Sequence, residues 1–275
     1  MNQSPLFKIT DLKYCYRDKS WEHTALDFKG CNFTIPKGKK TVLLGPSGCG
    51  KTTLLQILGL LRDIQSNQGD VVLNGDAEYS NLTDNKQIEL RGKQFGFILQ
   101  SFYLLPNFTA LQNIAMPLMF QGFSRNDALD KAKEFITVSK LSGSDENDLM
   151  QSMLKTSDKL SQGQKQRAAI LRSLIHGPSV IFADELTSNL DVNSVAKTFD
   201  LIEQWLQGAK PEDPRTFVMV THDLKVALKT GDYFVVINEK HNLAMTFERK
   251  DYEEKKEELN QILDHQPGTG GIDEK

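Results

Sequence analysis

The stretch that most constrains this chain is "KTVLLGPSGCGKTT", positions 40 to 53, which joins a short apolar run to a glycine-rich turn and a helical pattern. Its two outer glycines, the lysine and the first threonine have the spacing of a phosphate-binding loop (P-loop). In such a loop, backbone N–H groups at a helix N-terminus surround phosphate oxygens, the lysine reaches the terminal phosphates and the hydroxyl binds Mg²⁺. The alternative is an ordinary glycine-rich turn, but the strand before it and the helix after it favour phosphate binding. The predicted nucleotide-binding residues are Gly45, Pro46, Ser47, Gly48, Cys49, Gly50, Lys51, Thr52 and Thr53.

Composition narrows the class of protein. A chain of 275 residues can form one large domain or two small ones, and 39% hydrophobic with 25% charged residues is ordinary for a globular protein. The formal charge of −3 and the pI near 6.0 give no overall basic surface that would neutralise nucleic-acid phosphates. We therefore expect no nucleic-acid partner.

Cysteine usage and the apolar segments bear on location. Cys15, Cys31 and Cys49 form no CxxC pair and are odd in number, which favours a reducing cytosol over a disulfide framework. The longest apolar stretch, "LLQILGLL" at 54 to 61, is too short to span a bilayer and predicts a buried helix. Cys49 also lies inside the P-loop, where a helix N-terminus tends to raise the thiolate fraction. We expect a maleimide to inhibit the protein there and a bound nucleotide to protect it.

The order of strand-like and helix-like runs predicts an α/β fold. The first eighty residues are β-rich and contain Asn74-Gly75, a strong hairpin-turn signal. A helical pattern extends from about Ser101 to Lys159. Strand-like runs at 179–185, 216–223 and 233–239 then alternate with helical segments, which predicts a mostly parallel sheet buried on both faces. A charged helix is expected over residues 250–264, followed by a disordered tail.

Two acidic residues and a histidine follow apolar strands. Asp184 and Glu185 end "VIFADE", an arrangement that suits an aspartate supporting Mg²⁺ and a neighbouring carboxylate polarising the attacking water. His222 directly follows "FVMVT" and is positioned to orient that water or to contact the γ-phosphate. The alternatives are a solvated acidic pair and a structural histidine.

A second helix start also has phosphate-binding character. "KLSQGQKQRAAILRSL", positions 159 to 174, places a small hydroxyl, a glycine and two glutamines ahead of an amphipathic pattern. The P-loop already encloses the phosphates within one subunit. We therefore hypothesise that Ser161, Gly163 and Gln164 serve a nucleotide bound on another copy of the chain.

Taken together, "GPSGCGKTT", Gln100, "LSQGQ", "VIFADE", "SNLD" and "THD", in this order, resemble the nucleotide-binding subunit of ATP-binding cassette (ABC) transporters over about residues 6 to 240. The resemblance implies a P-loop NTPase of the ABC ATPase fold, with ATP and Mg²⁺ as cofactors. It also assigns the segments 160–164 to the signature and 188–191 to the D-loop. The implied catalytic residues are Glu185, His222 and Gln100; the implied metal-site residues are Thr52, Gln100 and Asp184; those acting in trans are Ser161, Gly163 and Gln164.

Some positions depart from the family pattern. Gln162 stands where the signature usually has glycine, while Leu186 and Ser188 replace a common proline and glycine. The segment 142–157 is longer than usual. An aromatic adenine platform is expected in the N-terminal strands, since a ring offers a stacking face to any base. Tyr16 is the predicted platform, with Trp21 as the competitor.

The runs "ILGLLRDIQSNQGDVVLNG" and "RGKQFGFILQSFYLLPNFTALQNIAMPL" most resemble the ATPases of the lipoprotein-release and macrolide-export group. That resemblance implies a transmembrane permease received by the helical subdomain. The hypothesis of shared sites adds a second ATPase subunit in a head-to-tail homodimer, and no nucleic-acid partner is expected.

Phe102, Tyr103 and Leu104, next to Gln100, are the expected contacts with that permease.

The same resemblance sets the expected domain limits and location. Residues 1–240 are expected to form the ABC ATPase domain, with a helical subdomain inserted at about 101–160 and an antiparallel β subdomain at the N-terminus. Residues 241–264 are expected to form a charged helical extension and 265–275 a disordered tail. The protein is expected to be cytoplasmic and peripheral on the inner face of the cell membrane, held there by the permease.

Two other functional classes are alternatives to a transporter subunit. A soluble ABC ATPase that maintains DNA would carry a long heptad insertion, and none is present. A ribosome-acting factor would usually have two cassettes and a basic linker. A non-enzymatic scaffold is disfavoured because the lysine, both acids and the histidine are all in place.

Overall fold

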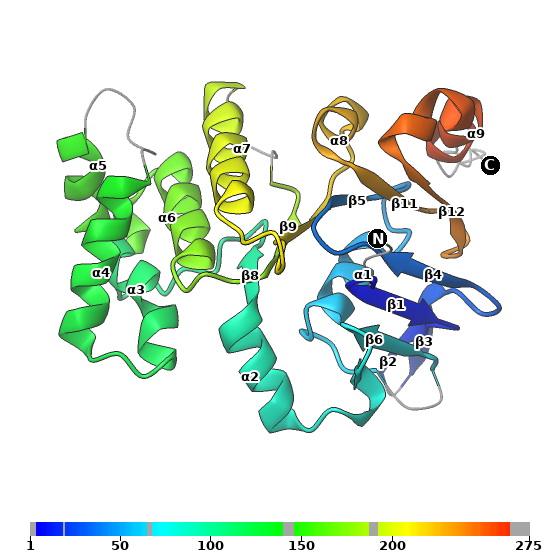
Figure 1. Cartoon of the computed structure of the whole chain (residues 1–275), viewed down its shortest axis with the longest axis horizontal. Coiled ribbons are helices and arrows are strands. Elements are labelled where there is room, and N and C mark those ends of the chain that lie inside the picture. Colours follow the sequence, from blue (N-terminus) through cyan, green and yellow to red (C-terminus); the bar gives the residue numbers. More distant parts are fainter. Residues whose placement is uncertain (1–3, 19, 65–67, 140–145, 187–191, 265–275) are drawn as a thin grey trace, which may run out of the picture. The chain divides into compact units, whose positions relative to one another are not determined.

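The computed structural model describes residues 4–18, 20–64, 68–139, 146–186 and 192–264. The chain divides into two compact units, and each is considered by itself (Figure 1). Unit 1 comprises Met1–Leu82 with Val220–Lys275, and unit 2 comprises Thr83–Met219. Among the described residues, no helix combines the length and the apolar character needed to cross a membrane.

Unit 1 contains an antiparallel four-stranded sheet of order β4-β1-β6-β7. The hairpin between β6 and β7 turns at Asn74 and Gly75, whose φ angles of 54° and 88° are the positive values that a type I′ turn needs. This confirms the predicted hairpin. The strands are β1 (Phe7–Thr10), β4 (Asn32–Ile35), β6 (Asp70–Leu73) and β7 (Ala77–Glu78).

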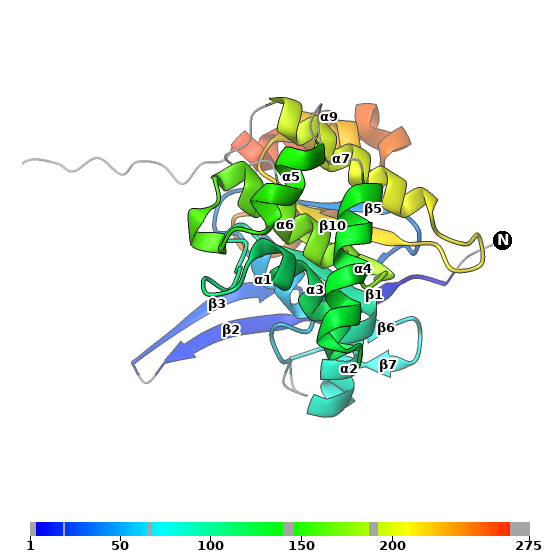
Figure 2. The same cartoon turned by 90° about the vertical axis from the view of Figure 1, so that its left-hand side faces the viewer.

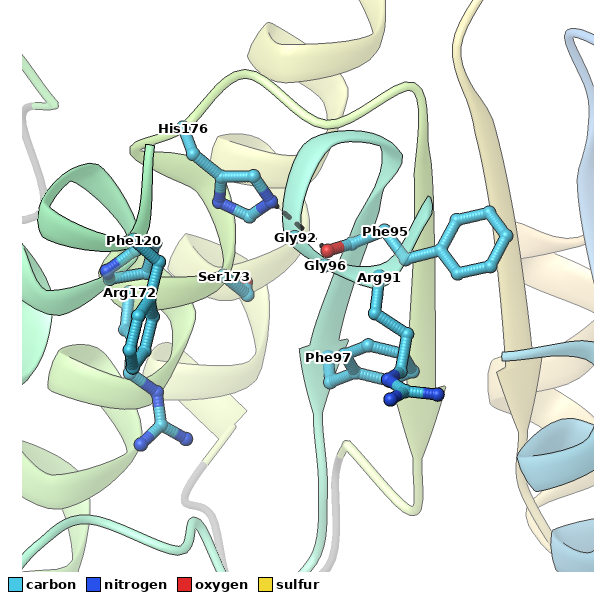
Figure 3. A pocket seen from close by; sticks show the side chains of 10 residues that line it. Arg91, Gly92, Phe95, Gly96, Phe97, Phe120, Arg172, Ser173 and His176 are labelled. Atoms are coloured by element: carbon cyan, nitrogen blue, oxygen red, sulfur yellow. Dashed lines mark hydrogen bonds between the residues drawn. The ribbon is translucent and has the colours of Figure 1, made fainter. Parts of the chain in front are cut away.

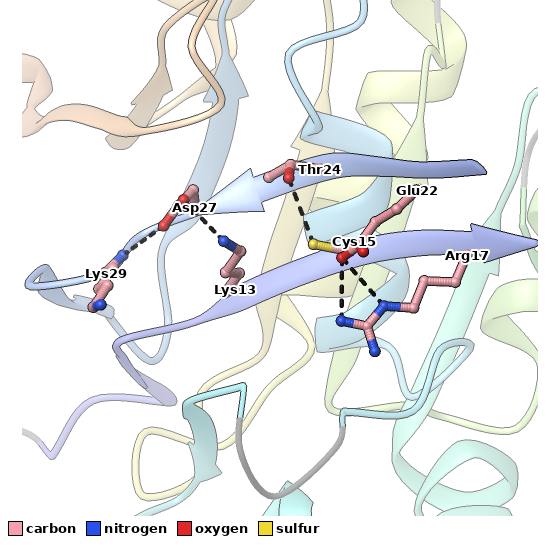
Figure 4. Close-up of polar contacts among 7 residues, drawn as sticks. All are labelled: Lys13, Cys15, Arg17, Glu22, Thr24, Asp27 and Lys29. Carbon is pink, nitrogen blue, oxygen red and sulfur yellow. Dashed lines mark hydrogen bonds and ion pairs between the residues drawn. The ribbon is translucent and has the colours of Figure 1, made fainter.

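A second hairpin of unit 1 pairs β2 (Lys13–Asp18) with β3 (Trp21–Asp27). Polar side chains link its two strands, among them an ion pair between Arg17 and Glu22 at 3.1 Å (Figure 4). The hydrogen bond from Arg17 lowers the pKa of the exposed Glu22 carboxyl. Within the β-rich N-terminal segment, β1 and β2 are separate strands because the chain turns at Asp11, where φ is 50°. That turn directs β1 and β2 into different sheets.

The parallel strands of unit 1 are β5 (Lys40–Leu44) and β11 (Tyr233–Ile237), with β12 (Leu243–Glu248) antiparallel to β11. Four of the five residues in β5 are buried, as expected of a strand covered on both faces. Three helices accompany these strands: α1 (Lys51–Leu58), α8 (Leu224–Thr230) and α9 (Tyr252–Asp264). Helix α9 confirms the charged helix expected over 250–264. The expected helical extension from 241 is wrong, because Leu243–Glu248 form β12 and pair with β11. Helix α1 ends earlier than expected, because the chain leaves the helix at Gly59 and Leu60 has a φ of 56°.

Unit 2 is built on β8 (Phe95–Ile98), which runs parallel to β9 (Val180–Asp184), with β10 (Thr216–Val220) as the next strand. The rings of Phe95, Phe97 and Phe182 pack together, with 5.3 to 6.5 Å between their centroids. Helices α2 (Asp84–Gln94), α6 (Gln162–Leu174) and α7 (Val192–Gln207) belong to this unit. Parallel pairing in both units confirms the predicted α/β class.

The helices α3 (Ala110–Phe120), α4 (Arg125–Val138) and α5 (Glu146–Met153) form the predicted helical segment of unit 2 (Figures 1 and 2). Thr109 begins α3 with a capping box, in which its hydroxyl and the Gln112 amide each satisfy a backbone N–H of the other residue. Ser124 caps α4, where its hydroxyl accepts from the Asp127 backbone N–H. Phe120 and Val138 remain 80% and 68% exposed. Short 3₁₀ turns lie at Tyr79–Asn81, Ser157–Lys159 and Arg249–Asp251.

Candidate nucleotide-binding and catalytic site

The P-loop depends on glycines whose places no other residue can take. A Cβ on Gly45 would collide with the carbonyl oxygen of Ile237, and one on Gly50 would collide with the carbonyl oxygen of Ala25. Both glycines also have positive φ angles, of 149° and 105°. The loop that leads into α1 therefore has a backbone conformation that only glycine adopts easily at these two positions.

The N-terminus of α1 is open to an anion. No side chain caps it, and its first turn holds no acidic residue. The first N–H groups of a helix lack partners within the helix and carry partial positive charge, so they bind phosphate oxygens well. This end of α1 therefore has the chemistry that the sequence predicted.

Lys51, the first residue of α1, brings a positive charge to the same loop. Its ammonium group donates to the carbonyl oxygens of Gly45 at 2.9 Å and Pro46 at 2.7 Å. Lys51 is only 7% exposed, so these carbonyls take the place of water around the charge. Next along the helix, Thr52 is exposed and Thr53 is buried. The lysine is thus held beside the helix start, where a terminal phosphate would lie.

The structure corrects the expectation for Cys49. Its side chain is 1% exposed, and its sulfur lies 3.9 Å from the Lys51 ammonium nitrogen. Burial raises the pKa of the Cys49 thiol, and the positive charge of Lys51 offsets only part of that rise. The expected gain in thiolate is therefore wrong, because removal from water outweighs the effects of the nearby charge and the helix start.

Tyr16, the predicted adenine platform, lies on β2 and contacts the P-loop helix. Its hydroxyl is 3.0 Å from the Thr53 hydroxyl. The Arg62 guanidinium lies 4.7 Å from the centre of the Tyr16 ring, and Arg62 donates to the side chain of Gln56 at 2.6 Å. Sequence reasoning missed Arg62, because nothing local in the sequence connects it with a tyrosine forty-six positions earlier. Trp21, the competitor, is 53% exposed.

In unit 2, Gln100 and Glu185 meet although 85 positions separate them in the sequence. The Gln100 amide donates to a Glu185 carboxylate oxygen at 3.1 Å. They meet because β8 and β9 are parallel neighbours, so that both residues follow the same edge of the sheet. Glu185 has a φ of 51°, an unusual conformation for a non-glycine residue that is often associated with functional sites. Asp184, the last residue of β9, is half-buried beside it.

The predicted signature forms the start of α6. Ser161 is the N-cap residue: its hydroxyl accepts from the Gln164 backbone N–H, and the Gln164 side chain accepts from the Ser161 N–H. This capping box gives both residues a structural role in addition to the one predicted in trans. A Cβ on Gly163 would meet no atom within 4 Å. Packing within this chain therefore does not explain why position 163 is glycine.

The segment after the paired acids connects with α6. The Gln166 amide donates to the Leu186 carbonyl at 2.7 Å, and the Leu186 side chain is buried. Leu186, one of the departures from the family pattern, thus takes a place in the core. The predicted D-loop, residues 188–191, lies outside the described part of the chain.

His222 follows β10, as predicted, and belongs to unit 1. Its imidazole is exposed, whereas Thr221 before it is buried. Asp223 after it caps α8 by accepting from two backbone N–H groups. The chain is therefore anchored on both sides of His222, which holds the histidine at the carboxyl end of the strand.

The predicted metal residues have the donor chemistry that Mg²⁺ requires. Thr52 offers an exposed hydroxyl oxygen, and Asp184 offers a half-buried carboxylate. The described residues contain no group of three or more histidine, cysteine or acidic side chains that could hold a metal ion by themselves. Mg²⁺ usually takes one or two carboxylates together with phosphate oxygens and water, so each of these groups is of a kind that it binds.

Unit 2 also contains a pocket of about 240 Å³ beside β8 (Figure 3). Phe120 and Arg172 lie along one side of it, and Phe97 and Arg91 along the other. His176 lines it as well, with its Nε2 atom 3.0 Å from the Phe95 carbonyl oxygen. Burial lowers the pKa of the His176 imidazole, while the Phe95 carbonyl opposes that shift. The pocket therefore combines aromatic rings with positively charged groups.

Comparison with known proteins agrees with this geometry. Residues 28–188 match the family described as ABC transporter. The chain is 36% identical over 227 residues to the lipoprotein-releasing system ATP-binding protein LolD of Shewanella frigidimarina (strain NCIMB 400), covering 82% of this chain and 88% of that protein. It is 32% identical over 225 residues to LolD 2 of Rhodopseudomonas palustris (strain ATCC BAA-98 / CGA009), covering 82% and 90%.

Solved structures give the same result. The chain is similar to the ATP-binding cassette MJ0796 in a dimeric post-hydrolysis state bound to ADP and Pi, with a TM-score of 0.74 and 29% identity. The match covers 88% of this chain and 98% of that one. A second dimeric structure of MJ0796, described as a bacterial ABC transporter cassette, matches with the same TM-score and 28% identity.

The fold and the P-loop together define an ATP-binding cassette ATPase. The chain belongs to the ABC transporter family and is an ATP-binding subunit similar to those of lipoprotein-releasing systems.

Proposed function

We propose that this ATPase hydrolyses Mg²⁺-bound ATP in a head-to-tail dimer and thereby drives a separate membrane permease of the lipoprotein-release or macrolide-export type. The observation that carries the proposal is the hydrogen bond between Gln100 and Glu185, which orients a carboxylate next to Asp184. The protein would act in the cytoplasm, on the inner face of the membrane, where the permease holds it.

In this proposal, each of a few side chains has one role in hydrolysis. Tyr16 stacks on the adenine, and Lys51 binds the terminal phosphates together with the N–H groups of α1. Glu185 takes a proton from the attacking water, and Gln100 orients both the carboxylate and the water. When bound, Mg²⁺ supplies positive charge for the phosphate oxygens, and Thr52, Gln100 and Asp184 would hold it. His222 contacts the γ-phosphate from the end of β10.

The signature residues, 160–164, would have a binding role in a dimer that they do not have in a single chain. No contact within the chain requires glycine at position 163. In the capping box the Ser161 hydroxyl only accepts a hydrogen bond, so its proton can still be donated to another group. A nucleotide bound on the partner would explain both, since it needs hydroxyl and N–H donors and close approach to the backbone. Binding of ATP would close the dimer and hydrolysis would reopen it.

The permease would dock on the helical part of unit 2. Tyr103 and Phe120 are 67% and 80% exposed, which is unusual for large aromatic side chains. Phe120 also lines the pocket beside β8, where Arg91 and Arg172 add positive charge. A cytoplasmic helix with apolar residues and an acidic side chain would complement this surface.

The substitution Glu185→Gln tests the proposed hydrolysis. We expect ATP binding to be unchanged, because the P-loop is intact, and turnover to fall by about 10²- to 10⁴-fold, the usual effect of removing a positioned general base. Binding is measured with a fluorescent ATP analogue and turnover by phosphate release. The exposed Glu212→Gln serves as a matched control and should behave like the wild type. Wild-type turnover in Glu185→Gln would show that another group is the base.

A further inference from the structure

The turn that follows Gln100 has an uncommon backbone conformation. Phe102 and Tyr103 have φ angles of 56° and 46°, so two consecutive non-glycine residues occupy the left-handed region. Such residues are strained relative to ordinary conformations and persist only where their surroundings hold them. Some other part of the structure must therefore stabilise this turn.

Arg172, on α6, makes that contact. Its Nη2 atom donates to the Phe102 carbonyl at 2.6 Å, and its Nη1 atom donates to the Tyr103 carbonyl at 2.8 Å. The two nitrogens of a guanidinium form a planar fork, which suits two adjacent carbonyl oxygens. A lysine has one ammonium nitrogen and cannot reproduce both bonds with the same geometry.

The position of Arg172 connects two parts of the candidate site. Helix α6 begins with the signature, where Ser161 is the N-cap residue. The turn held by Arg172 lies two residues after Gln100, whose amide reaches Glu185. A displacement of the turn would move Gln100, and a misplaced Gln100 would leave the Glu185 carboxylate poorly oriented.

We propose that Arg172 is a positioning residue for hydrolysis: its guanidinium holds the Phe102–Tyr103 turn so that the Gln100 amide stays within hydrogen-bond distance of Glu185. The inference rests on the proposed catalytic roles of Gln100 and Glu185. Arg172 acts through the turn, because its guanidinium donates to the backbone carbonyls of Phe102 and Tyr103. Arg172 also lines the pocket beside β8 (Figure 3). If its side chain is removed, a guanidinium ion from solvent can therefore enter the space that the side chain occupied.

The test compares Arg172→Ala and Arg172→Lys in the full chain, with the exposed Lys133→Ala of α4 as the control for loss of a positive charge. We expect kcat to fall by about 10- to 100-fold in Arg172→Ala, while KM for ATP changes by less than about twofold, because positioning affects the reacting groups and not the P-loop. Arg172→Lys should lie nearer to the alanine variant than to the wild type. Lys133→Ala should match the wild type.

Two further measurements separate positioning from a general structural role. Guanidinium chloride at about 50 mM, well below denaturing concentrations, should restore part of the kcat of Arg172→Ala but not that of Gln100→Ala. In the Gln100→Ala background, Arg172→Ala should cause little additional loss, because residues that act through one another are not additive.

The outcomes distinguish this inference from the proposed function. Full turnover in Gln100→Ala would refute the role given to Gln100 itself. Loss in Gln100→Ala with full turnover in folded Arg172→Lys would refute only the role of Arg172. An equal loss from Arg172→Ala with and without Gln100 would also overturn the inference, because Arg172 would then act independently of Gln100. If Arg172→Ala does not fold, turnover of Arg172→Lys is compared in the same way, with and without the Gln100→Ala change.

Discussion

Cys49 shows how the surroundings of one residue decide its chemistry. The thiol lies at the start of a helix and near a lysine, and both features favour a thiolate. Its side chain is nevertheless 1% exposed, and burial raises its pKa. Lys51 is likewise buried, but two carbonyl oxygens stabilise its charge. For the Cys49 thiol, removal from water therefore outweighs the helix start and the nearby lysine.

The raised pKa of Cys49 predicts a loss of stability at alkaline pH. A group whose pKa is raised by folding contributes stability below its unfolded pKa, and this contribution is lost as the pH rises through the folded pKa. Above about pH 8.5, the unfolded thiol ionises more readily than the folded one. The free energy of unfolding of the wild type should therefore fall more steeply than that of Cys49→Ser as the pH rises above about 8.5.

Urea titrations at several pH values give those free energies. The same burial predicts that a maleimide modifies Cys49 more slowly than the half-buried Cys15 and Cys31, which peptide mass spectrometry can resolve. Parallel stability curves for the wild type and Cys49→Ser, together with rapid modification of Cys49, would contradict the burial seen here.

Among the elements, α6 combines a structural cap with an unexplained glycine. Ser161 and Gln164 close the helix N-terminus, which stabilises α6 by about 1 kcal/mol relative to an uncapped start. Gly163 lies in the first turn, where alanine would fit without contact and would favour the helix. The local preference of this helix therefore opposes the residue that the sequence contains, as the proposed approach of a partner's nucleotide would require.

The substitution Gly163→Ala should separate stability from activity. We expect an equal or higher melting temperature, since alanine favours a helix by about 0.5–1 kcal/mol over glycine, and unchanged binding of ATP to the P-loop. Turnover should fall by about tenfold or more, because a methyl group would block close approach of the partner's nucleotide. Calorimetry and phosphate release measure the two effects.

Asn126→Ala provides a matched control, because it changes the corresponding position of α4, two residues after the Ser124 cap. It should leave turnover unchanged. Wild-type turnover in Gly163→Ala would indicate that no other molecule approaches this helix start closely.

At the scale of the whole molecule, the central question is whether each ATP site is shared between two chains. Pairing a Lys51→Ala chain with a Ser161→Arg chain leaves one composite site intact if sites are shared, because the good P-loop and the good signature then come from opposite subunits. Placing both changes on one chain and pairing it with the wild type puts one lesion in each shared site. Shared sites therefore predict higher ATPase activity from the first pairing, measured on isolated heterodimers. The reverse ranking would favour sites contained within single chains.

The elements that sequence analysis found were those with strong local signals. The Asn74-Gly75 hairpin and the P-loop helix are specified by residues a few positions apart. β12 and the separation of β1 from β2 were not anticipated. In "LAMTFE", the buried Met245 and Phe247 alternate with Thr246 and Glu248, but the run is short, and its pairing with β11 depends on the tertiary fold.

The sequence alone determined the P-loop, the paired acids and the signature start, because each of these depends on residue types at short, fixed spacing. Only the tertiary structure decided the burial of Cys49, the contact between Gln100 and Glu185, and the hold of Arg172 on its turn. These features bring together atoms that are distant in the sequence or remove them from water. Local spacing contains no information about either, because both depend on how strands pair and helices pack around them.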